Sequence, residues 1–163
     1  MTTLYWAYGS NLNHAHMRVR CPAARPAGRL VVPNAVLRFR GVADVDYLEG
    51  ARCEGGLWEI TRACEAALDR YEGVDAGLYE KCYLKIRWHD HSEREVLYYR
   101  MLRGGILPPD VDYLETIRRG YRDFGLSEAR LERALAHAWR AKRPTKQLRQ
   151  RWKRRGAKPL ARC

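Results

Sequence analysis

The sequence predicts an α+β domain with a largely antiparallel sheet or a small barrel, and three observations lead to this prediction. Most predicted strands neighbour one another along the chain, the longer helices come late, and the β–α alternation of a doubly wound fold is missing. No GxGxxG or P-loop pattern is present, which disfavours dinucleotide-binding and P-loop enzymes. The 163 residues suit one domain, and the five Trp and ten Tyr are expected mainly to fill its core.

Hydrophobic periodicity and chain-breaking residues place the individual elements. In chain order we expect a strand at 4–8, a helix that starts at Asn13 and stops before Pro22, strands at 30–39 and 55–60, a helix at 62–71, strands at 79–88 and 95–102, and helices starting at Asp110 and Ser127. Thr61 and Asp110 are favourable N-caps, and Gly73 suits the end of the helix before it. The polar residues 41–52 are expected to form a long connection. The alternating strands on either side of residues 89–92 predict a hairpin.

The positive charge of the chain is concentrated at its C-terminal end. The formal net charge is +12 and the sequence pI about 9.8, values that suggest a nucleic-acid partner. Residues 143–163 hold nine Lys or Arg and no acidic residue, whereas residues 1–142 hold 22 basic and 19 acidic residues. We therefore expect a nearly neutral domain at 1–142 and a basic tail at 143–163. The tail either attracts nucleic acid or another anionic surface, or is a solvated segment without a specific partner.

The cysteines and histidines show neither a disulfide pattern nor a metal pattern. The five cysteines are an odd number without a CxxC pair, so we interpret most of them as buried, small apolar residues in a reducing compartment. His14 and His16 point in different directions on a predicted helix, and His89 and His91 lie in a turn, so no metal is expected. No apolar run approaches the roughly 20 residues of a membrane helix, and the N-terminus lacks the features of a secretory signal. The sequence therefore predicts a cytoplasmic protein.

The segment Tyr8-Gly9-Ser10-Asn11-Leu12 is the first candidate site. It follows a strand and directly precedes a predicted helix. A glycine permits unusual backbone angles, so that successive N–H groups can converge on an anion, and the helix start favours a carboxylate. Ser10 and Asn11 add side-chain donors. An ordinary turn between a strand and a helix is the alternative interpretation.

Glu72, at the end of the helix predicted for residues 62–71, is the second candidate. The dipole of a helix disfavours a carboxylate at this end. Beside Tyr71 and Tyr79, such a glutamate can have a raised pKa and act as a general acid or base. The alternative is a solvated surface glutamate before the glycine that ends the helix. Arg18, Arg20 and Arg25 are, in turn, interpreted as surface charges or partners of carboxylates.

Taken together, the two candidates change the interpretation, because their order and spacing resemble the γ-glutamylcyclotransferase-like family. The resemblance rests on YGSNL at 8–12, GLWEIT at 56–61 and LDRYEGV at 68–74, with Tyr79 seven residues beyond Glu72. MRVRCP after the first loop and the region around Tyr113 also contribute. It departs from the usual pattern where Lys81 replaces an arginine common in the family, and the basic tail has no counterpart.

The resemblance implies a small, closed and mostly antiparallel β-barrel flanked by α-helices, with an acidic residue at its mouth. It also implies an intramolecular reaction, in which the α-amine of a γ-glutamyl group attacks its own γ-carbonyl, forms 5-oxoproline and releases the attached amine or amino acid. By matched motif, Glu72 takes the acid–base role. The implied substrate pocket is lined by Tyr8, Gly9, Ser10, Asn11, Leu12, Tyr79 and Tyr113. The reaction needs no metal or other cofactor.

One glutamyl group has to contact both motifs, which predicts their geometry. The Glu72 carboxylate and the N–H groups of residues 9–11 are expected about 5–8 Å apart. The cavity between them should be closed enough to raise the pKa of Glu72. The rival function is a catalytically silent family member that acts as a binding module, with the tail holding nucleic acid or another polyanion. The resemblance is compatible with a homodimer, and the sequence leaves open the oligomeric state and the amine that is released.

Overall fold

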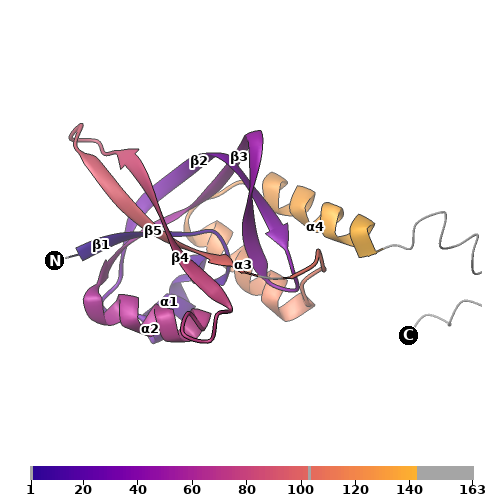
Figure 1. Ribbon diagram of the computed structural model, residues 1–163, viewed down its shortest axis with the longest axis horizontal. Helices are drawn as coiled ribbons and strands as arrows, with labels where there is room; N and C mark the ends of the chain where they lie inside the picture. Colours follow the sequence, from indigo (N-terminus) through magenta and orange to yellow (C-terminus); the bar gives the residue numbers. More distant parts are fainter. Residues whose placement is uncertain (1, 103, 143–163) are drawn as a thin grey trace, which may run out of the picture.

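In the computed structural model, residues 2–102 and 104–142 are described, and within them five strands form one sheet flanked by four α-helices (Figure 1). The strands are β1 (Thr2–Ala7), β2 (Arg25–Phe39), β3 (Ala43–Thr61), β4 (Tyr79–Arg87) and β5 (Glu93–Met101). The helices are α1 (His14–Arg20), α2 (Arg62–Glu72), α3 (Val111–Asp123) and α4 (Ala129–Lys142), and a 3₁₀ turn, η1 (Ser10–Leu12), follows β1. The predicted α+β class is confirmed.

The sheet is mixed, with β1 at its centre. The hydrogen-bonded order is β2-β3-β1-β5-β4, in which β1 runs antiparallel to β3 and parallel to β5. The pairs β2–β3 and β4–β5 are antiparallel hairpins. The mostly antiparallel pairing is therefore confirmed. Within the described ranges β2 and β4 are the two edge strands, so the closed barrel implied by the resemblance is not confirmed.

The polar residues 41–52 do not form the long connection that the sequence predicted. Most of this segment is the first half of β3, which pairs with β2 across a short turn. Charged side chains are tolerated here because they pair with arginine: Arg40 Nε lies 2.7 Å from Asp44 Oδ2, and its Nη2 lies 2.7 Å from Asp46 Oδ1. Asp44 also accepts a hydrogen bond from a backbone N–H of β5. These ion pairs, the bond from β5 and the ladder with β2 outweigh the preference of the segment for a loop.

The ends of the helices agree with the local signals in the sequence. The side chains of Asn13, Thr61 and Asp110 each accept a hydrogen bond from the backbone N–H three residues later, as N-caps do. Gly73 ends α2 in the left-handed conformation, with φ at +66°. The end of α2, and with it the direction of Glu72, is thus fixed by local chemistry.

The core lies between the sheet and the helices. In the view of Figure 1, α1 and α2 lie together below the sheet, whereas α4 packs beside the β2–β3 hairpin. The largest fully buried apolar side chains come from both layers and from the loop after β1: Trp6, Leu12, Met17, Phe39, Ile60, Leu68, Leu97, Ile117 and Leu131. The loop that carries the first candidate site is therefore anchored in the core through Leu12.

Four cysteines lie in the described part of the chain, and all four are free thiols. Cys21, Cys53 and Cys64 are buried and Cys82 is partly buried, which agrees with their interpretation as small apolar residues. Cys163 lies outside the described residues, as does the whole predicted basic tail, 143–163. In the described ranges, no helix is long and apolar enough to span a membrane.

Candidate active site

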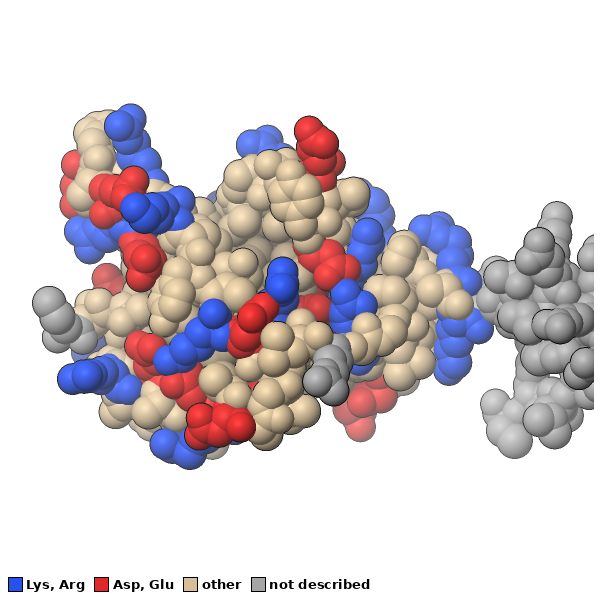
Figure 2. All heavy atoms as spheres, in the orientation of Figure 1, with Lys and Arg blue, Asp and Glu red and all other residues tan. Residues whose placement is uncertain are grey.

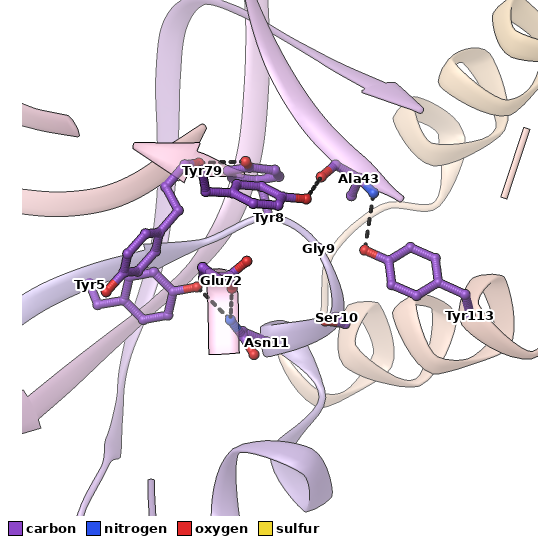
Figure 3. Close-up of a pocket in the computed structure, with 10 residues that line it drawn as sticks. Tyr5, Tyr8, Gly9, Ser10, Asn11, Ala43, Glu72, Tyr79 and Tyr113 are labelled. Carbon is purple, nitrogen blue, oxygen red and sulfur yellow. Dashed lines mark hydrogen bonds between the residues drawn. The ribbon is translucent and has the colours of Figure 1, made fainter. Parts of the chain in front are cut away.

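A small cavity lies between the loop after β1, the end of α2 and the sheet (Figure 3). Its volume is about 30 Å³, which is room for about two or three water molecules. The lining residues are Tyr5, Tyr8, Gly9, Ser10, Asn11, Ala43, Glu72, Tyr79, Tyr99 and Tyr113. This tyrosine-lined cavity brings the two candidate motifs together.

The loop after β1 is shaped by η1 and by the absence of a side chain at Gly9. Backbone hydrogen bonds from Leu12 N–H to the Gly9 carbonyl, and from the next N–H to the Ser10 carbonyl, close the turn. Because these are bonds between residues i and i+3, the N–H groups of Ser10 and Asn11 have no acceptor within the turn. A Cβ at position 9 would lie 2.9 Å from the Cβ of Ala43. Glycine thus lets the loop pass close to the start of β3.

Asn11 joins this loop to Glu72. Its Nδ2 donates to Glu72 Oε1 at 2.9 Å and to the Tyr5 hydroxyl at 2.8 Å, as Figure 3 shows. The predicted proximity is confirmed, although 61 residues separate Asn11 from Glu72. The contact is made by the Asn11 side chain, which reaches the carboxylate directly.

The position of Glu72 changes its proton affinity. Burial raises the pKa of Glu72 from 4.5 to about 7, while the Asn11 hydrogen bond and the charge of Arg20 act in the opposite direction. A raised pKa is the direction that the sequence predicted. A carboxyl group with a pKa near neutrality populates both protonation states, which is what an acid–base group requires.

Neutral tyrosine hydroxyls form the rest of the wall. Tyr8 donates to the Tyr99 carbonyl at 2.5 Å, and Tyr79 donates to the Ala43 carbonyl at 3.4 Å. The Ala43 N–H donates to the Tyr113 hydroxyl at 3.0 Å. Burial raises the pKa of Tyr113 to about 12 and raises the pKa values of the other lining tyrosines as well. Five tyrosines therefore line the cavity: Tyr8, Tyr79 and Tyr113, which the resemblance placed in the pocket, and Tyr5 and Tyr99, which were expected only to fill the core.

Arg20 is a further site residue, which the sequence assigned only to surface charges or partners of carboxylates. Its Nη1 donates to Asn11 Oδ1 at 2.5 Å, and its Nη2 donates to the Tyr71 hydroxyl at 2.6 Å. The guanidinium carbon also lies 3.6 Å from the centre of the Tyr71 ring. Because Arg20 holds the oxygen of the Asn11 amide, the nitrogen of that amide faces Glu72.

Lys81, the departure from the family pattern, lies outside the cavity and holds α2 against the sheet. Its Nζ lies 2.7 Å from Glu65 Oε1 and 2.7 Å from Asp69 Oδ2, both on α2. The Tyr99 hydroxyl also donates to Asp69, at 2.7 Å. These contacts fix the helix whose last residue is Glu72.

Most of the predicted site residues line the cavity, and one does not. Those that line it are Tyr8, Gly9, Ser10, Asn11, Glu72, Tyr79 and Tyr113, joined by the unpredicted Tyr5, Ala43 and Tyr99. Leu12 is fully buried and packs on α3 at Gly120, so it anchors the loop without facing the cavity. His14 packs edge-on against Trp58 and Phe124, and within the described ranges no group of three or more His, Cys, Asp or Glu residues could hold a metal.

The chain is similar to known proteins over most of its length. A model of the AIG2-like family matches residues 52–133. A mouse protein named "Gamma-glutamylcyclotransferase" is 26% identical over 147 residues, which cover 83% of this chain and 78% of the mouse protein. A human protein of the same name is 27% identical over 135 residues, 76% of this chain and 72% of the human protein. A solved structure named "Gamma-glutamyl cyclotransferase" superimposes with a TM-score of 0.71 at 22% identity, covering 94% of this chain and 99% of that one, and shows the same fold.

Proposed function

The chain belongs to the AIG2-like family, and from this premise we propose that it is a γ-glutamylcyclotransferase, which closes the γ-glutamyl group of a small molecule to 5-oxoproline and releases the attached amine or amino acid. The single observation that carries the proposal is the Asn11–Glu72 hydrogen bond. It joins the YGSNL loop to a carboxyl group with a pKa of about 7 inside a tyrosine-lined cavity. The names of the mouse and human relatives support the same reaction class.

Glu72 is proposed to carry a proton from the substrate amine to the leaving nitrogen. Its carboxylate accepts a proton from the α-ammonium group of the substrate, and the free amine then attacks the γ-carbonyl. The new N–C bond closes a five-membered ring. As the tetrahedral intermediate collapses, the bond to the leaving nitrogen breaks and the Glu72 carboxylic acid returns its proton to that nitrogen. The ring nitrogen still carries a second proton, which passes to the released amine, so that the products are the neutral lactam and an ammonium group. A pKa of about 7 suits both steps, because neither protonation state of Glu72 is rare near neutral pH.

The loop after β1 is proposed to hold the substrate and the developing negative charge. The N–H groups of Ser10 and Asn11 are free of acceptors within η1, so they can donate to the α-carboxylate or to the oxyanion. The nucleophile is already tethered to the group that it attacks. Positioning by the pocket therefore supplies much of the rate enhancement.

Arg20 is proposed as a positioning residue, which acts through Asn11. It contacts the Asn11 oxygen and Tyr71, and it is not among the residues that line the cavity. By fixing the amide it keeps a donor directed at Glu72, and its charge lowers the pKa of Glu72. Both effects hold the carboxyl group ready to lose a proton.

Release of 5-oxoproline by the full chain tests the proposal. The substrates are a panel of γ-glutamyl amino acids, γ-glutamylamines and glutathione, and each has an N-acetylated counterpart as its control. We expect 5-oxoproline from at least one member of the panel and none from its acetylated counterpart, because the blocked amine cannot attack. Release of glutamate in place of 5-oxoproline would indicate hydrolysis and contradict the proposal. A folded protein that yields no product from any substrate would also contradict it and favour the catalytically silent binding module.

A further inference from the structure

A second and larger hollow lies between the β2–β3 hairpin and α4. Its volume is about 500 Å³, and it shares no lining residue with the tyrosine-lined cavity. We call it the α4 groove, and its lining comprises residues 36–38 of β2, residues 50–54 of β3, Tyr121 of α3, and Arg130, Arg133, Ala134, His137 and Arg140 of α4. Helix α4 packs on the hairpin through three buried residues, two of them alanines: Leu131, Ala134 and Ala138.

Basic side chains come from both walls of the α4 groove. Arg38 and Arg52 come from the hairpin, and Arg130, Arg133 and Arg140 come from the helix. The positions on α4 recur at helical spacing, and with a rise of 1.5 Å per residue the first and the last are about 15 Å apart along the axis. Figure 2 shows Lys and Arg side chains gathered over α4, at the right-hand end of the molecule.

Most of these arginines have no close acidic partner. Glu54 is the one acidic residue among the described lining residues, and it lies 4.0 Å from Arg130. Within residues 2–102 and 104–142, Arg52, Arg133 and Arg140 form no ion pair of 4.0 Å or less. Elsewhere, arginines of α3 and of the β4–β5 hairpin pair with carboxylates at 3.1 Å or less. Like charges that converge without partners repel one another, and a bound anion would relieve that repulsion.

His137 adds a polar atom without a partner to the same groove. Its Nδ1 is buried and has no hydrogen-bond partner in the described part of the chain. Burial lowers the pKa of His137, and the nearby charges of Arg38 and Arg140 lower it further, against the effect of Asp46. A lowered pKa favours the neutral imidazole, so His137 adds a polar, uncharged ring to the lining of the groove.

We propose that the α4 groove binds the phosphodiester backbone of single-stranded nucleic acid. Guanidinium groups pair with phosphate oxygens in a bidentate geometry, and cationic grooves that follow the backbone are typical of single-strand binding. A concave groove with cations on both walls fits a linear chain of phosphates better than the plane of a lipid surface. Residues 143–163, directly after α4, add nine Lys or Arg and no acidic residue to the same end of the chain. Tyr121 is buried and offers no ring for stacking, so binding is expected to be independent of base sequence.

Fluorescence anisotropy of a labelled single-stranded oligonucleotide of mixed sequence tests this site, with the full chain titrated at several salt concentrations. The test variant Arg133→Gln/Arg140→Gln removes two charges from the groove. The matched control, Arg62→Gln/Arg87→Gln, removes two exposed charges from α2 and β4, outside the groove. We expect the groove variant to bind about 10-fold more weakly, with a log–log salt dependence shallower by about 1.4, because each lost phosphate contact removes about 0.7 from the slope. The control should stay within about 2-fold of the wild type, because its charges lie outside the binding surface.

Three further measurements test the opposite wall of the groove, the basic tail and the specificity for nucleic acid. Arg52→Gln, on the opposite wall, should also weaken binding, and it serves as the test if the helix variant does not fold. Substitution of Arg149, Arg151, Lys153 and Arg154 by Gln in the full chain tests the tail. Loss of binding in the tail variant with wild-type affinity in both groove variants would place the site in the tail and overturn the inference. Anionic lipid vesicles or polyglutamate that displace the oligonucleotide at equal charge concentration would overturn the assignment to nucleic acid.

Discussion

The tyrosine-lined cavity and the α4 groove differ in the charged groups that they hold and in how far those groups are desolvated. The cavity, of about 30 Å³, surrounds a single carboxyl group so closely that burial raises its pKa to about 7. The groove, of about 500 Å³, holds five arginines of which three have no ion-pair partner in the described ranges. A small space that desolvates a carboxyl group changes its proton affinity and suits chemistry, whereas a wide cationic space suits binding. The net charge of +12 therefore says little about the chemistry, because the candidate acid–base group lies in the nearly neutral part of the chain.

The largest expected effect is on turnover, from the substitution Glu72→Gln. Glutamine keeps the shape of the side chain and an oxygen that can accept from Asn11, but it cannot take up the proton of the substrate amine. We expect 5-oxoproline release to fall by about 10²-fold or more, while the circular dichroism spectrum stays unchanged. If the variant keeps more than a tenth of the wild-type rate, Glu72 is not the acid–base residue.

The same substitution should change stability in a pH-dependent way. The pKa of Glu72 is about 7 in the folded chain and about 4.5 when it is unfolded, so the folded state holds the proton more tightly. The stability that this proton provides is complete below pH 4.5 and is lost as the pH rises through 7, a change of about 2–3 kcal/mol. Glu72→Gln removes this dependence.

Denaturant unfolding of both proteins at several pH values measures this difference. Relative to the wild type, Glu72→Gln should gain about 2–3 kcal/mol in its free energy of unfolding between pH 4.5 and pH 8. A constant difference between the two proteins across this range would mean that burial does not raise the pKa of Glu72.

A smaller effect is expected at Arg20, which lies outside the cavity lining. Arg20→Ala frees the Asn11 amide and should lower kcat about 10-fold, because the donor to Glu72 is no longer fixed. Since Arg20 lowers the pKa of Glu72, its removal should also move the acidic limb of the pH–rate profile to higher pH. Arg18→Ala, on the exposed side of the same helix, is the matched control and should change neither quantity. A fall in kcat with an unmoved pH profile would reduce Arg20 to a purely structural role.

The smallest expected effect is that of substitutions in the α4 groove on the rate of 5-oxoproline release. The two sites share no lining residue. Arg133→Gln/Arg140→Gln should therefore release 5-oxoproline within about 2-fold of the wild-type rate, because well-separated changes without shared partners act independently. A larger loss of turnover would mean that the two sites are functionally coupled and would contradict the distinction drawn between them.

Local chemistry explains which parts of the fold could be predicted. Thr61, Asp110 and Gly73 mark helix ends through contacts within a few residues, so the sequence predicts them directly. The strand character of residues 43–52 depends on pairing with β2, and the ion pairs of Arg40 with Asp44 and Asp46 make charged residues tolerable there. The closed barrel implied by the resemblance is not confirmed among the described strands. Closure depends on pairing between strands far apart in sequence, which local sequence patterns do not specify.

The candidate site divides in the same way. The YGSNL loop and Glu72 belong to contiguous motifs that carry the family resemblance, and their proximity was predicted from the reaction that this resemblance implies. Tyr5 and Tyr99 contribute through the positions of β1 and β5 in the sheet, which no local pattern specifies. Nothing in the sequence distinguishes Arg20 from Arg18, because their difference arises only when α1 packs beside α2.

The most direct test of the central claim is the titration of Glu72 itself. Carbon-13 NMR of the full chain, with glutamate labelled at the carboxyl carbon, follows each side chain with pH, and the resonance missing from the spectrum of Glu72→Gln identifies residue 72. We predict a midpoint of about 7 for this carboxyl group. A midpoint at or below the ordinary value of about 4.5 in the folded protein would contradict the acid–base role, because a carboxyl group fully ionised at neutral pH could not return a proton to the leaving nitrogen.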